Sequence, residues 1–211
     1  MGEKIVMDAL EYLVSKYEID LNAKSPIEIP NVGRDSIPQI LNQLQFKTGA
    51  EIGVARGIYT LKIVQCNPQM KMFAIDPYAY PEIFAGCQKI AHDRLAPYPN
   101  VEFICKSSMD AVADFKDNSL DFVYIDANHI YEYVLQDIVE WQKKVRPGGI
   151  IAGHDYYQTP KKDIGYIVDV KRAVCEYTSG HNIHPWFILG TKLKVQGEIR
   201  DNCRSWLWVK S

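Results

Sequence analysis

A short buried strand and the start of a helix meet in the stretch TGAEIGVARGIYT, residues 48–60. The strand ends at Gly53, and after Gly57 the apolar residues follow the spacing of an amphipathic helix over 57–67. Glycine between a strand and a helix lets the backbone approach a ligand at the carboxyl end of the strand. A tight turn that needs glycine for its backbone angles is the alternative interpretation. The stretch predicts the first strand–helix unit of an α/β sheet, with a candidate binding loop.

The same alternation continues along the chain. Further strands are predicted over 71–76, 101–108, 119–126 and 148–156, and further helices over 81–98, 109–115, 130–145 and 166–178. Strands separated by helices of this length favour right-handed crossovers and a mostly parallel sheet. Two last strands, over 183–190 and 204–210, lie too close in sequence for another crossover helix and should pair antiparallel. We expect a seven-stranded, mostly parallel sheet with one antiparallel strand near the edge and helices on both faces.

The residues before this core form an extension. Residues 4–17 place apolar side chains at helical spacing. Residues 23–38 contain three prolines and a glycine, so they should hold no regular element for long and should form a loop near the mouth of a site. A short helix over 36–45 follows. The length of 211 residues suits one domain, with 1–45 as the N-terminal helical extension and loop and 46–211 as the core.

Composition excludes several classes of protein. With 47% hydrophobic residues, 24% charged residues and a net charge of −2, the chain has neither a nucleic-acid-binding charge pattern nor a disordered tail. Its five scattered cysteines form no C-x-x-C pair, which argues against disulfides or a structural zinc site. No stretch resembles a signal peptide, and no apolar run approaches the ~20 residues of a membrane span. We expect a cytoplasmic protein with neither a membrane nor a nucleic-acid partner; a homo-oligomer stays open.

Two acids near the glycine loop indicate the kind of cofactor. Asp76 ends the next strand, nineteen residues after Gly57, where a carboxylate can bind both ribose hydroxyls of a nucleoside. Glu51 lies two residues before Gly53, where it would disfavour a pyrophosphate and attract an ammonium and a sulfonium. S-adenosylmethionine carries both of these cations. The alternative for Glu51 is a hydrogen bond within the loop.

Polar residues end the next two strands. The stretch YIDANHIYE, residues 124–132, carries Asp126 and His129, and His154 and Asp155 end the strand after it. If the strands are neighbours, two carboxylates lie close together and repel each other unless a cation separates them. Asp126 and Asp155 would suit Mg²⁺, and His154 would favour Mn²⁺, Fe²⁺ or Zn²⁺. His129 could then remove a proton from an acceptor hydroxyl. Structural roles without a metal are the alternative for both aspartates.

The chain resembles a known family over roughly residues 47–177. The family is the class I S-adenosylmethionine-dependent methyltransferases, in particular the metal-dependent sugar O-methyltransferases of macrolide biosynthesis and their cephalosporin-pathway relatives. The resemblance rests on EIGVARGIYT, FAIDPY, DFVYIDANHIYEYVLQDIVEWQKKVRPGGIIAGHDY and VKRAV. Within them, D-x-x-H-x-Y-E and P-G-G-x-x-x-G-H-D-Y are specific, whereas the glycine loop alone is not.

This resemblance implies a Rossmann-like fold and a set of site residues. Those implied to bind S-adenosylmethionine are Gly53, Gly57, Thr60, Asp76, Ser107 and Ser108, and we expect Glu51 and Asp126 to contact the cofactor as well. Thr60 would lie near the methionine carboxylate, and Ser107 and Ser108 near adenine. The metal would be held by Asp126 and Asp155, and the general base would be His129.

One residue departs from the family pattern. The metal-dependent relatives carry an acid where this chain has His154, which weakens the assignment of Mg²⁺. His154 could bind a softer metal or act as a second base in an enzyme without a metal.

The sequence therefore predicts an S-adenosylmethionine-dependent methyltransferase that acts on the oxygen of a small hydroxylated acceptor, assisted by Mg²⁺ or Mn²⁺. A metal-independent methyltransferase, an NAD-binding oxidoreductase and a non-catalytic nucleoside-binding module are the alternatives. The acceptor should contact the loops 22–36, 78–86 and 156–166, where Lys161 and Lys162 hint at an anionic acceptor.

Overall fold

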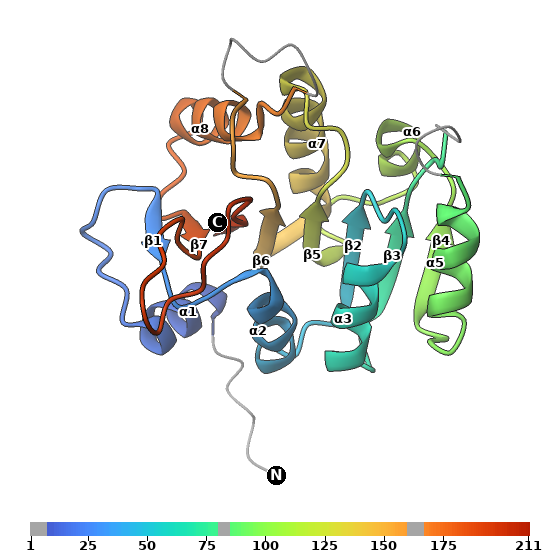
Figure 1. The fold of residues 1–211 in the computed structure, drawn as a ribbon, viewed down its shortest axis with the longest axis horizontal. Helices are drawn as coiled ribbons and strands as arrows, with labels where there is room; N and C mark the ends of the chain where they lie inside the picture. The colour runs from blue at the N-terminus through green and yellow to red at the C-terminus, as the bar shows by residue number, and fades with distance from the viewer. Residues whose placement is uncertain (1–7, 80–84, 160–166) are drawn as a thin grey trace.

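One eight-stranded sheet forms the centre of the computed structural model, which describes residues 8–79, 85–159 and 167–211 (Figure 1). The strands are β1 (Ile27–Ile29), β2 (Thr48–Ile52), β3 (Lys71–Ile75), β4 (Val101–Ile104), β5 (Leu120–Ile125), β6 (Val145–Gly153), β7 (Phe187–Leu189) and β8 (Trp206–Val209). They lie in the order β1-β7-β8-β6-β5-β2-β3-β4. Only β8 runs antiparallel to its neighbours.

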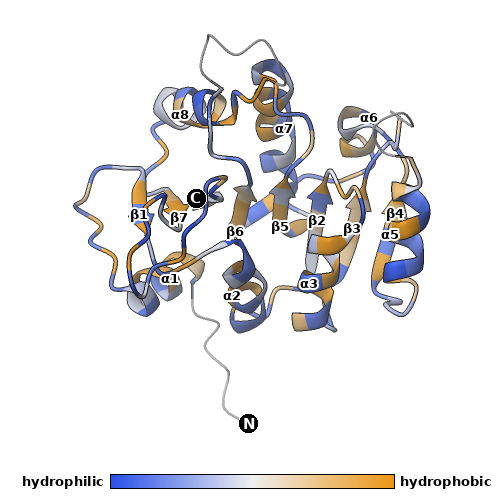
Figure 2. Cartoon of the chain, viewed as in Figure 1, coloured by the Kyte–Doolittle hydropathy of each residue, from blue (hydrophilic) through white to orange (hydrophobic). Residues whose placement is uncertain are grey.

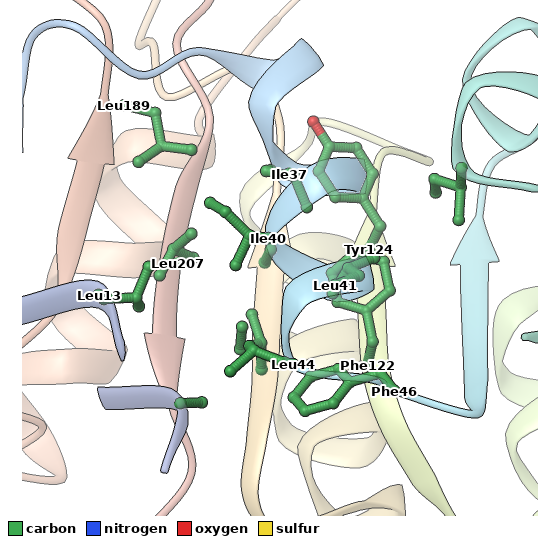
Figure 3. Packing of buried hydrophobic residues seen from close by; sticks show 14 of the residues in the cluster. Leu13, Ile37, Ile40, Leu41, Leu44, Phe46, Phe122, Tyr124, Leu189 and Leu207 are labelled. Carbon is green, nitrogen blue, oxygen red and sulfur yellow. The ribbon is translucent and has the colours of Figure 1, made fainter. Parts of the chain in front are cut away.

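Helices cover both faces of this sheet (Figure 1). They are α1 (Ala9–Tyr17), α2 (Ile37–Gln43), α3 (Ile58–Cys66), α5 (Cys87–Leu95), α6 (Ser108–Val112), α7 (Tyr131–Lys144) and α8 (Val170–Gly180), with a 3₁₀ turn η1 (Arg34–Ser36). Because successive side chains of a strand point to opposite faces, β5 contributes to two separate cores. Phe122 and Tyr124 pack with α1, α2 and α3 (Figure 3), whereas Val123 and Ile125 pack with α6, α7 and α8.

Both cores are built from the apolar sides of amphipathic elements. Figure 2 shows mainly hydrophobic strands in the middle of the sheet and helices with a hydrophobic and a hydrophilic side. Trp141 of α7 and Trp206 of β8 are both fully buried. Among the residues that the structure describes, no helix has the length and apolar character needed to cross a membrane.

The predicted fold class is confirmed, with one correction to the number of strands. β7 and β8 pair antiparallel as predicted, and β8 lies between β7 and β6. The eighth strand, β1, comes from the segment 23–38, for which we expected a loop; it pairs in parallel with β7. Three residues are too few to show an alternating pattern, and the partner strand lies far away in sequence. The helix predicted over 4–17 begins at Ala9, and the residues before Asp8 lie outside the described part of the chain.

Candidate functional site

Most of the predicted site residues lie at or just after the carboxyl ends of β2, β3, β5 and β6, at one edge of the sheet, whereas Ser107 and Ser108 follow β4 and Thr60 lies in α3. Backbone hydrogen bonds hold these ends together. The Gly53 N–H donates to Ile75 O at 2.9 Å, the Asp126 N–H to Ile52 O at 2.8 Å, and the His154 N–H to Ile125 O at 3.1 Å. Four consecutive strand ends of the sheet are thereby fixed to one another, so the side chains that follow them share one crevice edge.

Gly53 is required by the close approach of two chain segments. Its backbone has φ of +92°, and a Cβ atom placed there would lie 2.2 Å from the carbonyl oxygen of Asp126 and 2.7 Å from the Cα of Ala127. Gly57 begins α3 with φ of +69°. Glycine is the residue that adopts both conformations without strain. The loop thus needs its glycines for its own geometry, and ligand binding by them stays a prediction.

Asp76 orients the same loop. Its Oδ2 accepts hydrogen bonds from the N–H groups of Val54 at 3.0 Å and Ala55 at 2.8 Å, and its Oδ1 accepts one from Tyr78 at 2.8 Å. A carboxylate has about four lone-pair positions, so these bonds leave room for a further donor. The structure brings Asp76 to the glycine loop, as predicted, and its contact with ribose stays a prediction.

Glu51 and Thr60 form a buried pair beneath the loop. The Glu51 side chain is 1% exposed, Thr60 is fully buried, and the Thr60 hydroxyl donates to Oε2 of Glu51. Burial raises the pKa of Glu51 to about 8, against the opposing effects of the Thr60 hydrogen bond and the Arg34 charge. A carboxyl with this pKa is mainly neutral at pH 7.

Ser107 and Ser108 both have partners inside the fold. The Ser107 hydroxyl accepts from the N–H of Asp110 at 3.2 Å, which caps α6. The Ser108 hydroxyl donates to the carboxylate of Asp137 and accepts from the indole N–H of Trp141 at 2.8 Å. These bonds explain why serines follow β4, and the predicted approach of the two residues to adenine stays untested.

Two aspartates and two histidines gather where β5 and β6 end. The Oδ2 of Asp155 lies 3.0 Å from His129 Nε2 and 3.3 Å from His154 Nδ1. The Oδ1 of Asp126 lies 3.4 Å from His129 Nε2 and 4.0 Å from His154 Nδ1. Each of these side chains is 15% to 21% exposed, so the cluster is partly buried yet reachable. This geometry agrees with the prediction that the four side chains lie close together where the two strands end.

The histidines determine the charge of Asp155. Burial alone would raise the pKa of its carboxyl, but hydrogen bonds from His129 and His154 outweigh burial and hold that pKa well below its usual range. Asp155 also has φ of +51°, a left-handed conformation that non-glycine residues seldom adopt. Such conformations persist where the surrounding structure enforces them, as at many active sites.

Arg34 is a member of this cluster that the sequence analysis did not identify. Its Nη2 lies 2.6 Å from Asp126 Oδ2. Its guanidinium centre lies 4.1 Å from the centroid of the Tyr59 ring and 5.1 Å from that of Tyr124. The segment 22–36 was expected near the mouth of the site, but no motif marked this residue within it.

Asp201 and Cys203 also reach the cluster, from the segment between β7 and β8. Asp201 Oδ2 lies 4.0 Å from His154 Nε2, on the side of the imidazole that faces away from Asp126. The Cys203 thiol forms a hydrogen bond with Asp155, and burial together with that bond raises the pKa of the thiol to about 11. Cys203 is therefore a neutral thiol, and Asp201 adds a third carboxylate beside the His154 ring.

The donor atoms fit a divalent cation. Asp126, His154 and Asp155 can each offer one ligand atom, and these atoms lie within 4.8 Å of one another. Two carboxylate oxygens and one imidazole nitrogen suit Mn²⁺, Fe²⁺ or Zn²⁺ better than Mg²⁺. Lys161 and Lys162, which were expected to meet an anionic acceptor, lie outside the described residues.

A family model described as a methyltransferase domain matches residues 50–156. This range includes the glycine loop, Asp76 and the Asp126–Asp155 cluster. Arg34, Asp201 and Cys203 lie outside it. A search of curated proteins gives no match.

Solved structures show the same fold at low sequence identity. A putative caffeoyl-CoA O-methyltransferase from Staphylococcus aureus aligns with a TM-score of 0.64 at 14% identity, over 100% of this chain and 93% of that one. An O-methyltransferase from Bacillus cereus in complex with SAH aligns with 0.64 at 16% identity, over 100% and 92%. The O-methyltransferase TomG from Streptomyces achromogenes in complex with SAM gives 0.58 at 16%, over 100% and 92%.

Proposed function

The chain belongs to the family of methyltransferase domains, and on that premise we propose that it transfers the methyl group of S-adenosylmethionine to a hydroxyl oxygen of a small acceptor. One observation carries the proposal: Asp126, His129, His154 and Asp155 gather beside the glycine loop, at the edge where α/β sheets bind ligands. The structural relatives that contain SAM or SAH support the choice of cofactor.

The chain offers groups that match each part of the cofactor. Gly53 lets the end of β2 lie directly against the Asp126 backbone, and we expect the loop of Gly53 and Gly57 to line the methionine part. Glu51 and Thr60 supply a buried polar pair for its ammonium and carboxylate, and Asp76 a carboxylate for ribose. Methyl transfer is an in-line displacement, so these residues contribute mainly by orienting the cofactor toward the acceptor oxygen.

Asp126, His154 and Asp155 would hold a divalent cation, most suitably Mn²⁺. When bound, such a cation lowers the pKa of an acceptor hydroxyl. His129 is the proposed general base. Its Nε2 lies within 3.4 Å of both carboxylates, so when the other ring nitrogen, Nδ1, takes up a proton, two negative charges stabilise the imidazolium.

A metal-independent methyltransferase is the second candidate, and one observation favours it. Arg34 already places a positive charge 2.6 Å from Asp126. In that case Arg34 and the histidines offset the negative charges of the carboxylates. His129 then removes the proton of the acceptor hydroxyl without help from a metal.

Turnover with a panel of acceptors tests the proposal. Purified protein is mixed with methyl-labelled S-adenosylmethionine and catechols, sugars or hydroxy acids, with Mn²⁺ or EDTA. We expect label in an O-methyl product of at least one acceptor class. Cofactor binding without transfer to any hydroxylated acceptor would instead indicate another acceptor atom or a binding module.

The affinity for S-adenosylmethionine is expected to rise with pH up to about 8 and then level off. Because the pKa of Glu51 is about 8, its carboxyl is mainly protonated at pH 7. A cationic cofactor favours the carboxylate, so binding below that pH releases a proton and affinity falls by up to about tenfold per pH unit. Titration calorimetry in two buffers of different ionisation enthalpy measures the released proton.

The matched control is Glu51→Gln, which keeps the shape of the side chain and cannot ionise. This variant should bind more weakly above pH 8, with no proton release and little dependence on pH. Wild-type protein whose affinity is constant from about pH 6 to 9 would show that Glu51 does not face the cations of the cofactor.

A further inference from the structure

Arg34 holds a permanent positive charge at the candidate metal centre. An arginine guanidinium does not lose its proton in proteins, so this charge is present at any working pH. The group is packed against the rings of Tyr59 and Tyr124 and ion-paired with Asp126 at 2.6 Å. Its side chain is 24% exposed, so solvent screens this charge only in part.

The two oxygens of Asp126 have different neighbours. Oδ2 bonds to Arg34, whereas Oδ1 lies 4.0 Å from His154 Nδ1. Oδ1 is therefore the oxygen that could join His154 and Asp155 in binding a cation. Any cation held there would lie close to the guanidinium, because both oxygens belong to one carboxylate.

We propose that Arg34 is a built-in counter-charge that keeps the affinity of the Asp126–His154–Asp155 centre for divalent cations low. Arg34 then offsets one of the two carboxylate charges without a metal, and it decides how far the enzyme depends on one. This inference rests on the metal centre of the proposed function, but its test measures cation binding alone.

Two opposing effects decide the sign. By fixing Oδ2, Arg34 orients the carboxylate, and losing such an outer partner typically weakens metal binding about 10- to 100-fold. The positive charge of Arg34 also repels a bound dication, and the repulsion energy is twice that for a singly charged cation. At an effective dielectric of about 20 and a separation of roughly 6 Å, this repulsion weakens binding on the order of ten thousandfold before solvent screening is counted. Removing Arg34 relieves more repulsion than it loses in orientation of the carboxylate, so the variant should bind the cation more tightly.

The test is calorimetric titration with Mn²⁺ of the wild-type protein and of Arg34→Met, without cofactor or acceptor. We expect Arg34→Met to bind Mn²⁺ at least about tenfold more tightly, which corresponds to about 1.4 kcal/mol. Arg34→Lys keeps the charge and should stay close to wild type. Adding Asp126→Asn to Arg34→Met should remove the gain, which assigns it to this centre.

Lys62→Met is the matched control for a lost charge. Lys62 lies in α3 and pairs with the exposed Asp35, the residue next to Arg34, so this variant removes a positive charge close to that segment but outside the cluster. Its Mn²⁺ affinity should equal that of wild type. If Arg34→Met does not fold, as judged by thermal unfolding, Arg34→Gln carries the same expectation.

If folded Arg34→Met or Arg34→Gln bound Mn²⁺ no more tightly than wild type, the inference would be overturned and Arg34 would be a positioning residue. Absence of binding in every variant would overturn it as well. A parallel titration of the same samples with S-adenosylmethionine separates this failure from failure of the proposed function, because cofactor binding does not need the cation.

Discussion

Replacing Gly53 with alanine is expected to destabilise the protein by at least about 3 kcal/mol and to abolish cofactor binding. The new Cβ would lie 2.2 Å from the Asp126 carbonyl oxygen and 2.6 Å from its carbonyl carbon. These are backbone atoms of the next strand end, so no side chain can move aside to make room. The φ of +92° adds further strain for any residue with a Cβ atom. Denaturant unfolding and titration with S-adenosylmethionine measure the two effects.

Gly180→Ala is the matched control for Gly53→Ala. A Cβ at Gly180, the last residue of α8, would meet nothing within 4 Å. This change should alter stability by less than about 1 kcal/mol. A Gly53→Ala protein with the stability and cofactor affinity of wild type would show that β2 and β5 do not approach each other as described.

Replacing His129 with glutamine is expected to lower the rate of methyl transfer by about 10²- to 10⁴-fold while leaving the affinity for S-adenosylmethionine within about twofold of wild type. Glutamine can still hydrogen-bond to Asp126 and Asp155, but it cannot accept the proton of the acceptor. Single-turnover kinetics with saturating cofactor measure the chemical step.

His181→Gln is the control for His129→Gln. His181 follows α8 and bonds to the carbonyl oxygen of Tyr177, outside the cluster. It should keep wild-type rates. If His129→Gln weakened cofactor binding and the rate in proportion, His129 would be a binding residue and not the base.

The sequence allowed most of the fold to be predicted because the core obeys simple rules. β2 to β6 alternate with helices at regular spacing, and the short connection between β7 and β8 requires an antiparallel pair. β1 was missed because its three residues gain their stability from pairing with β7, and long-range pairing leaves no local pattern.

Candidate site residues were predicted where a strand end and a motif coincide, as at Asp126 and Asp155. Arg34 and Asp201 lack a motif, but topology could have indicated their region. Residues after β1 lie at the same edge as the other parallel strand ends. β8 is reversed, with Trp206 opposite Gly153, so the residues before β8 also lie at that edge. Which side chain there meets the cluster depends on tertiary packing.

The protonation state of Glu51 was likewise beyond the sequence. Its position before the glycine loop predicted an ionised carboxylate that attracts a cationic cofactor. The structure shows that the side chain is 1% exposed, and this burial raises its pKa to about 8. Burial of a single side chain follows from the assembled sheet and helices, and no local pattern encodes it.

Calorimetric titration of the wild-type protein with S-adenosylmethionine, repeated with Mg²⁺, Mn²⁺ and EDTA, tests the central claim most directly. The account predicts saturable binding at one site per chain in every condition, with a Mn²⁺-dependent difference only at high concentrations of the metal. Absence of binding in all conditions would contradict the proposal that this methyltransferase domain uses S-adenosylmethionine.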